Sequence, residues 1–175
     1  MFVPSEDIYL LQTANPAFSY TFQTLLGAEY GIIIKSSKDQ LFLSDFNLGD
    51  IEVLEFQFYL VAGDLATNDI KLQATIIYII HKLVVERENI IWYICDSADG
   101  RGAFRARLFD SWFRKYAVDG VIKMDGSMRE SIDSENDLYV SVVINSRNPY
   151  KDTITQIFYR AVNQIDFSKN PGASL

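Results

Sequence analysis

The sequence predicts an α+β fold, close to the α/β type, with a mixed and largely antiparallel sheet of about seven strands and three helices. Two observations lead to this class. Runs rich in β-branched and aromatic residues fill the first third of the chain, where short polar turns separate them. From residue 69 onward, stretches with helical spacing of apolar residues alternate with continuous apolar runs, an order typical of strands joined by helices.

The first part of the chain predicts four strands, beginning as an antiparallel meander. Tyr20 to Leu26 and Tyr30 to Lys35 are a hairpin distance apart, and a third strand is expected over Gln40 to Phe46. The fourth strand, Ile51 to Leu60, is apolar on odd positions at its start and on even positions later. This phase slip has two interpretations: a β-bulge near Val53 to Glu55, or a strand that is buried on both faces.

The middle of the chain predicts a helix, a central strand and a second helix. Asp69 to Arg87 repeats apolar residues at helical spacing, with polar residues on the opposite face. Ile90 to Cys95 is a continuous apolar run, as in a parallel strand that is buried on both faces. Arg101 to Tyr116 is expected to be the second helix, and Gly120 lies just beyond it, where a helix stop is common.

The last part predicts two strands and a third helix. Val121 to Met124 and Leu138 to Asn145 have strand patterns, and Asn148 followed by Pro149 is typical of a helix start. The tail from Ser168 is expected to be frayed. No repeat or linker divides the sequence, so residues 1–175 are expected to form a single domain.

The composition excludes several classes of function. The formal charge is -7, from 16 Lys and Arg against 23 Asp and Glu, and such a charge repels nucleic acids and anionic membranes. One Cys and one His allow no intramolecular disulfide and almost no zinc site, so we expect neither a metal nor a cofactor. The apolar segment Ile70 to Val85 is too short and too polar to span a bilayer, and the amino terminus lacks signal-peptide features. We therefore expect a cytoplasmic protein.

Polar side chains concentrate where the predicted central strand ends. Asp96 and Asp99 follow the strand, and Gly100 follows Asp99, so two carboxylates lie at the carboxyl edge of the sheet, where α/β folds tend to bind ligands. The pair could bind a hard cation or act as an acid and a base. Alternatively, the same residues only form the turn, and the Asp99 side chain caps the following helix.

The helix after this turn is locally basic. Arg101 and Arg105 are four residues apart and share a helix face, so they could bind a phosphate or a carboxylate. The alternative is that Arg101 pairs with Asp96 or Asp99 and the remaining basic residues form a solvated surface. In that case the charged residues join the strand end to the helix.

Other reactive or aromatic residues are interpreted as structural. His81 borders an apolar helix face and is expected to be a partly buried, hydrogen-bonded imidazole. Cys95 ends a buried strand without electropositive neighbours in the sequence, so we expect an inert thiol. The spacing of the aromatic residues around both is typical of a core and not of a platform for stacking bases.

The string Tyr93-Ile94-Cys95-Asp96, with Asp99-Gly100-Arg101 after it, resembles an uncharacterised bacterial family of unknown function. Arg107-Leu108-Phe109 and Trp112-Phe113 extend the resemblance. This resemblance implies no activity.

The order of the predicted elements resembles the Gcn5-type N-acetyltransferase fold without its first two helices, and this resemblance implies an acetyl-CoA cofactor. In that family a glycine-rich loop after the fourth strand binds the pyrophosphate of the coenzyme. Here the corresponding residues, Val61 to Asp69, contain one glycine and the acidic Asp64 and Asp69, which disfavour that ligand. Glu55 lies where some members of the family have a general base.

Three functions remain open. The preferred hypothesis is a non-catalytic domain that binds a protein or a small anionic ligand at Asp96, Asp99, Arg101 and Arg105. The alternative is an acyl-CoA-dependent N-acyltransferase with a non-standard cofactor loop and Glu55 or an aspartate as base. The third is a structural subunit of a homodimer, which predicts an exposed apolar strip on an edge strand.

Overall fold

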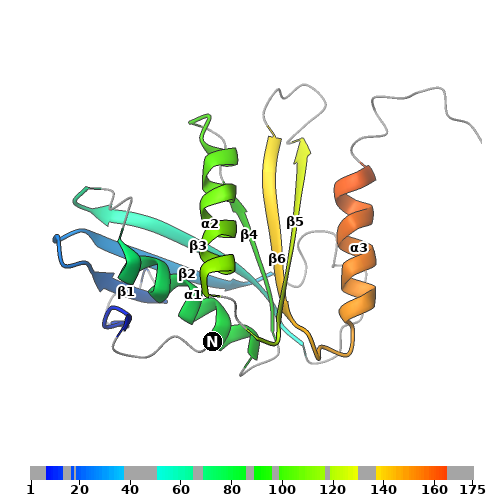
Figure 1. Cartoon of the computed structure of the whole chain (residues 1–175), viewed down its shortest axis with the longest axis horizontal. Coiled ribbons are helices and arrows are strands. Elements are labelled where there is room, and N and C mark those ends of the chain that lie inside the picture. The colour runs from blue at the N-terminus through cyan, green and yellow to red at the C-terminus, as the bar shows by residue number, and fades with distance from the viewer. Residues whose placement is uncertain are drawn as a thin grey trace, which may run out of the picture.

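The computed structural model describes residues 7–13, 17, 19–37, 51–64, 69–85, 89–95, 99–116, 119–129 and 137–164. These residues form six strands and three helices (Figure 1). In chain order the elements are β1 (Tyr20–Gln23), β2 (Glu29–Ser36), β3 (Val53–Ala62), α1 (Ile70–Val85), β4 (Ile90–Cys95), α2 (Gly102–Tyr116), β5 (Val121–Arg129), β6 (Asp137–Asn145) and α3 (Lys151–Gln164).

The strands form one mixed sheet in the order β1-β2-β3-β4-β6-β5. Every neighbouring pair is antiparallel except β3 and β4, which are parallel and are connected through α1. The predicted α+β class with a largely antiparallel sheet is therefore confirmed, although the described residues hold six strands where about seven were expected. The expected strand over 40–46 lies outside the described residues, and β2 and β3 on either side of it in the sequence pair directly.

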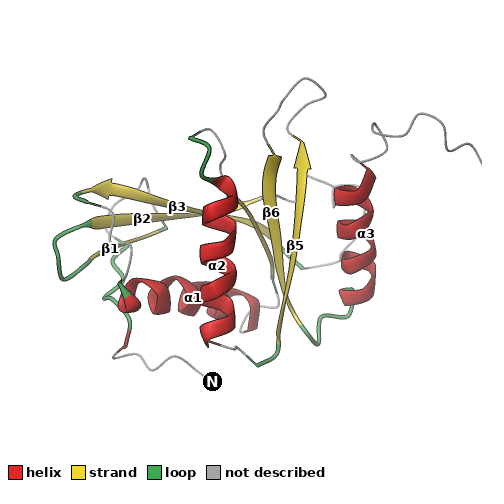
Figure 2. Cartoon of the chain, turned by 45° about the horizontal axis from the view of Figure 1, so that its top comes forward, coloured by secondary structure: helices red, strands yellow, loops and turns green. Residues whose placement is uncertain are grey.

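Helices cover both faces of the sheet (Figure 2). One hydrophobic cluster contains buried residues of α1 and α2 with one face of the sheet, and a second contains α3 residues with the other face. Along β6 the faces alternate as a strand requires, because Val143 belongs to the first cluster and Val142 to the second. The result is a three-layer domain in which the central strands are buried on both sides.

Burial on both faces explains the phase slip in β3. Val53 belongs to the α3-side cluster and its neighbour Leu54 to the α1-side cluster, so both phases are apolar at the start of the strand. Pairing with β2 is regular from Leu54 to Leu60. The predicted bulge near Val53 to Glu55 is therefore wrong, and the only register shift in this pair lies at the other end, between Glu29 and Tyr30.

Helix α1 is buried around much of its circumference, which offsets the modest helix preference of its many isoleucines. Asp69 precedes its first turn and accepts a hydrogen bond from the Leu72 backbone N–H at 2.9 Å, which is helix-capping chemistry. None of the described helices is long and apolar enough to cross a membrane.

Candidate functional site

The parallel strands β3 and β4 stay together for only three residue pairs. Val53 lies opposite Ile90, Leu54 opposite Ile91 and Glu55 opposite Trp92. Beyond these pairs β3 continues beside β2, while β4 continues beside β6, and the two strands separate (Figure 1). We call this opening, bounded by residues 56–62 of β3 and 93–95 of β4, the fork.

In the described part of the chain, the strand edges that face the fork carry backbone groups without a strand partner. Ile90 N–H donates to the Glu52 carbonyl at 2.8 Å, which shows that even-numbered residues of both strands direct their backbone groups across this gap. Among the described residues, Phe58, Leu60 and Ile94 therefore have no strand partner on the side of the fork. Such N–H and C=O groups require hydrogen-bond partners, either water or a ligand.

Apolar side chains are exposed on both arms of the fork. Tyr59 and Leu60 on β3 are 44% and 36% exposed, and Ile94 on β4 is 41% exposed. Single exposed apolar residues are ordinary, but these flank strand edges that also lack partners. The fork thus combines exposed apolar side chains, on both faces of the sheet, with backbone donors and acceptors that have no strand partner among the described residues.

The closed end of the fork is fixed by hydrogen bonds. Trp92 Nε1–H donates to Ser37 Oγ at 2.7 Å, and the Ser37 hydroxyl donates to the Val53 carbonyl at 3.2 Å. These contacts join the ends of β2, β3 and β4, so the point at which the strands separate is rigidly defined. Glu55 lies in the last residue pair before the opening.

Glu55 begins a row of polar side chains along β3. The Gln57 amide donates to the Glu55 carboxylate, and the Tyr59 hydroxyl donates to Gln57 Oε1 at 2.7 Å. The three residues alternate with Phe56 and Phe58, so they share one face of the strand. Glu55 is half-buried and held in place by this row, but its role as a base remains a prediction.

The β3 arm is followed in the sequence by the start of α1, where the Asp69 carboxylate stabilises the first turn of the helix. Asp69 caps the helix and also accepts a hydrogen bond from the Tyr9 hydroxyl at 2.7 Å. Asp64 is exposed nearby in sequence, and residues 65–68 lie outside the described part of the chain. A protein carboxylate therefore already occupies the helix start at which a bound diphosphate would be expected.

The structure brings together two of the four residues predicted to bind a ligand at the corner between β4 and α2. Arg105 donates to both carboxylate oxygens of Asp99, at 2.7 and 2.6 Å, and the Arg101 backbone N–H donates to Asp99 Oδ1 at 3.0 Å. The Arg105 guanidinium lowers the pKa of Asp99 to about 2. Asp96 lies outside the described residues, so its place in this cluster stays a prediction.

This geometry favours the structural interpretation for Asp99 and Arg105, although the pairing differs from the expected one. The prediction paired Arg101 with an aspartate, but Arg105, in the first turn of α2, makes the ion pair with Asp99. The Arg101 side chain is exposed and pairs with no acidic side chain among the residues described. Arg101 is thus the member of the set that is left available to an anion.

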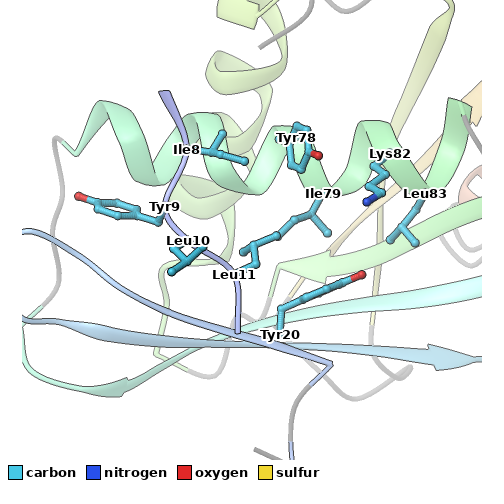
Figure 3. Close-up of a pocket in the computed structure, with 9 residues that line it drawn as sticks. All are labelled: Ile8, Tyr9, Leu10, Leu11, Tyr20, Tyr78, Ile79, Lys82 and Leu83. Atoms are coloured by element: carbon cyan, nitrogen blue, oxygen red, sulfur yellow. The ribbon is translucent and has the colours of Figure 1, made fainter. Parts of the chain in front are cut away.

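A pocket lies beside α1, and none of its lining residues belongs to β3 or β4 (Figure 3). It is a cavity of about 390 Å³ between residues 8–11, Tyr20 and the second half of α1. Apolar side chains form most of its wall, and the polar groups of Tyr20, Tyr78 and Lys82 lie among them. Nothing in the sequence indicates this pocket, since residues 8–11 show no periodic pattern.

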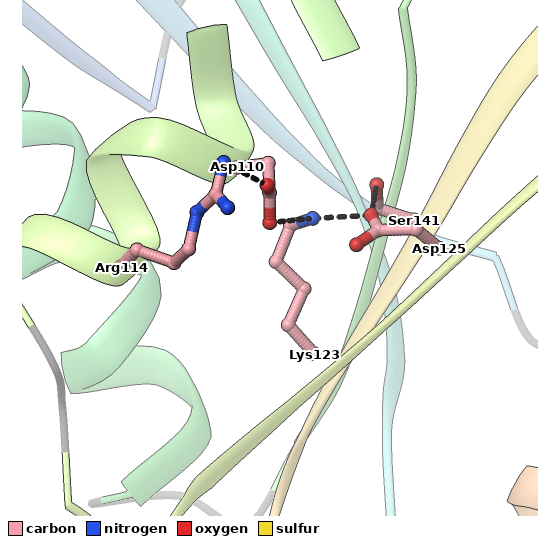
Figure 4. A network of polar contacts seen from close by, with 5 residues as sticks. All are labelled: Asp110, Arg114, Lys123, Asp125 and Ser141. Atoms are coloured by element: carbon pink, nitrogen blue, oxygen red, sulfur yellow. Dashed lines mark hydrogen bonds and ion pairs between the residues drawn. The ribbon is translucent and has the colours of Figure 1, made fainter. Parts of the chain in front are cut away.

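A charged network links α2 to the sheet (Figure 4). Lys123 on β5 pairs with Asp125 on the same strand and with Asp110 on α2, at 3.7 Å for the second pair. Ser141 Oγ–H donates to the Asp125 carboxylate at 2.6 Å, and Arg114 pairs with Asp110 at 2.7 Å. Lys123 is missed in the sequence analysis, although its spacing of two from Asp125 already indicates that they share a strand face.

Two buried groups beside this network lack the partners that buried polar groups usually have. The Tyr93 hydroxyl and Trp112 Nε1–H have no hydrogen-bond partner among the described residues. Burial raises the pKa of Tyr93 well above its ordinary value, while the nearby Ser141 hydroxyl acts in the opposite direction. Burial likewise raises the pKa of Cys95 to about 11, which agrees with the prediction of an inert thiol.

Neither the corner nor the network forms a metal site in the described part of the chain, where no three His, Cys, Asp or Glu side chains cluster suitably. Within the described ranges, the polar groups that a ligand could use therefore include the backbone edges of the fork, Arg101 and the pocket residue Lys82.

Comparison with known proteins identifies a family. Residues 68–160 match the family of unknown function DUF6169, and because the match covers more than half of the sequence, the chain belongs to this family. The expectation of a family of unknown function is thus confirmed. No curated protein and no solved structure matches the chain. The matched residues contain β4, α2, β5 and β6, whereas the β3 arm of the fork precedes them.

Proposed function

We propose that this chain is a non-catalytic binding domain whose ligand places an extended, amide-containing arm in the fork and an anionic end near Arg101. One observation carries the proposal: a parallel strand pair in the middle of the sheet separates after three residue pairs and leaves facing backbone edges without partners among the described residues. A thin extended ligand can complete hydrogen bonds on both edges, as an added strand does.

The charge distribution supports a direction for this ligand. The β3 arm ends toward Asp64 and the capping residue Asp69, and both would repel an anion. The β4 arm leads to α2, at whose start the exposed Arg101 side chain has no acidic partner among the described residues. An anionic end is therefore favoured on the β4 side, close to the corner at residues 95–105.

A second candidate function is acyl transfer from an acyl-CoA to a primary amine. It is favoured by Glu55, which lies at the closed end of the fork, and by the strand order with a separating parallel pair, which resembles that of Gcn5-type N-acetyltransferases. The capped start of α1 opposes the usual mode of coenzyme binding, since the Asp69 carboxylate lies where a diphosphate would have to bind.

Calorimetric titration with 4′-phosphopantetheine tests the binding proposal, because this molecule has two amides in an extended arm and a single terminal phosphate. We expect it to bind the unmodified chain. Ile94→Glu adds a negative charge on the β4 arm and should weaken this binding at least tenfold. The matched control is Leu25→Glu, which makes the same change at an 85% exposed position on the β1–β2 turn and should leave binding unchanged.

The outcomes separate the two candidates. If acetyl-CoA binds and its acetyl group is transferred to an amine, and Glu55→Gln abolishes the transfer, the second function replaces the first. If 4′-phosphopantetheine does not bind, or binds Ile94→Glu as well as the unmodified chain, the fork is not the binding site.

A further inference from the structure

We propose that the pocket beside α1 binds a small amphipathic carboxylate, whose apolar tail fills the cavity and whose carboxylate pairs with Lys82. This site is separate from the fork and does not depend on the function proposed for it. The pocket lies between the amino-terminal segment, β1 and α1, whereas the fork is bounded by β3 and β4, which contribute no lining residue to the pocket.

The wall formed by the amino-terminal segment is held at two places. Tyr9 N–H donates to Thr75 Oγ1 on α1 at 2.8 Å, and the Tyr9 hydroxyl donates to Asp69 at 2.7 Å. Three residues later, Gln12 and Thr21 exchange backbone hydrogen bonds of 2.8 Å in each direction. Leu10 and Leu11 lie between these anchors, so the cavity beneath them is a feature of the folded chain and not a gap under a loose end.

Most of the pocket wall is apolar, and Lys82 is its one charged residue. Ile8, Leu11, Ile79 and Leu83 supply hydrocarbon surface, and Leu10, which is 80% exposed, forms part of the rim. A tail in the cavity would remove this surface from water, and such burial is worth about 25 cal/mol per Å². The exposed Leu10 side chain is therefore an additional indication that an apolar ligand belongs here.

The charge of Lys82 specifies the head group of the ligand. Its side chain is half-buried, and its amino group points into the pocket, on the side where the Tyr20 hydroxyl also lies (Figure 3). Lys82 makes no ion pair with any acidic side chain of the described residues. An ammonium group next to apolar surface gains most from an anionic partner, because a charge-assisted hydrogen bond compensates for lost hydration.

The size of the cavity limits the ligand. A volume of about 390 Å³ has room for roughly a dozen groups of the size of a water molecule, at about 30 Å³ each. A carboxylate with a chain of about eight carbons fits this space, and octanoate is a suitable probe. The uncharged 1-octanol has a similar tail and serves as the control for the head group.

Calorimetry with both probes, together with amide chemical-shift mapping, tests the proposal. We expect octanoate to bind at least tenfold more tightly than 1-octanol and to shift the amides of residues 8–11 and 78–83. Lys82→Met retains the length of the side chain without its charge, and should weaken octanoate binding at least tenfold. Lys151→Met makes the same change at a half-buried position on α3 and should have no effect.

A second variant keeps the test independent of any effect of Lys82 on folding. Leu10→Glu places a carboxylate at the exposed rim, where it should be tolerated by the fold and should repel octanoate. The proposal is overturned if octanoate does not bind, if 1-octanol binds equally well, or if either pocket variant binds octanoate as the unmodified chain does. A negative result with octanoate does not contradict the function proposed for the fork, because that function is tested separately with 4′-phosphopantetheine and Ile94→Glu.

Discussion

The packing of α3 on the edge strand β5 depends on the absence of a side chain at residue 126. A Cβ atom added at Gly126 would lie 2.6 Å from Val162 Cγ1 and 2.9 Å from Val162 Cβ. Ordinary contacts between carbon atoms are about 3.5–4.0 Å, so Gly126→Ala requires a displacement of about 1 Å. We predict that this substitution destabilises the chain by forcing α3 away from β5.

The magnitude follows from how firmly α3 is held. Ile154 and Phe158 on the same helix are fully buried in the α3-side cluster, so α3 cannot move outward without loosening them. Overpacking of this kind lowers the free energy of unfolding by about 1–3 kcal/mol. Alanine regains about 0.5–1 kcal/mol over glycine in a strand. The expected net loss is therefore about 1–2 kcal/mol.

Urea denaturation of a double-mutant cycle measures this effect. Val162→Ala removes Cγ1 and Cγ2, which a Cβ at residue 126 would meet at 2.6 and 3.1 Å, but it keeps the Cβ at 2.9 Å, so it should relieve a measurable part of the loss caused by Gly126→Ala and not all of it. Ser127→Ala, at the exposed neighbouring position, is the control and should change stability by less than about 0.5 kcal/mol. The reasoning fails if Gly126→Ala alone is neutral, or if the effects of the two substitutions simply add.

Two further predictions concern polar groups near α2. Tyr93→Phe removes a buried hydroxyl without a partner among the described residues. The free energy of unfolding, measured by urea denaturation, should therefore rise by about 1 kcal/mol. A decrease of that size would show that the hydroxyl has a hydrogen-bond partner. In an NMR titration the Asp99 carboxyl should have a midpoint near pH 2, and in Arg105→Gln this midpoint should return toward the usual pKa of an aspartate. Because the pKa is lowered in the folded chain, the ion pair is complete above about pH 4 and is lost as the pH falls toward 2. An unchanged midpoint in that variant would contradict the assigned partner.

The secondary structure was predictable where burial is periodic or complete. The apolar run at Ile90 to Cys95 has the same bounds as β4, because a strand buried on both faces is apolar throughout. The helical pattern before it likewise predicted α1. The helix starts differ from what the spacing indicates: the helical repeat of apolar residues would place Ile70 and Phe104 on the buried faces of α1 and α2, but they are 64% and 54% exposed. The spacing of apolar residues identifies which face of a helix is buried, but it does not show how far along the helix the packed neighbouring elements extend.

The candidate site was predictable in part. The turn after β4 does carry a clustered Asp99 and Arg105, as the concentration of polar residues indicated. The fork was not predictable, because it depends on how many residue pairs β3 and β4 share, and nothing local to either strand encodes that number. The phase slip at Val53 is visible in the sequence, but its cause is burial on two faces and not a bulge.

The two candidate binding sites share one structural element, α1. Its amino-terminal cap, Asp69, makes the end of the β3 arm anionic, and it also accepts the hydrogen bond that holds Tyr9 over the pocket. One carboxylate thus stabilises the helix start, disfavours a phosphate-rich ligand beside the fork, and fixes a wall of the second site. Lys82, near the other end of α1, lies where the helix dipole favours a cation, which keeps the pocket suited to an anionic head group. The negative charge at the start of α1 and the positive charge near its end therefore both match the helix dipole. The same charges disfavour a phosphate beside Asp69 and favour a carboxylate beside Lys82.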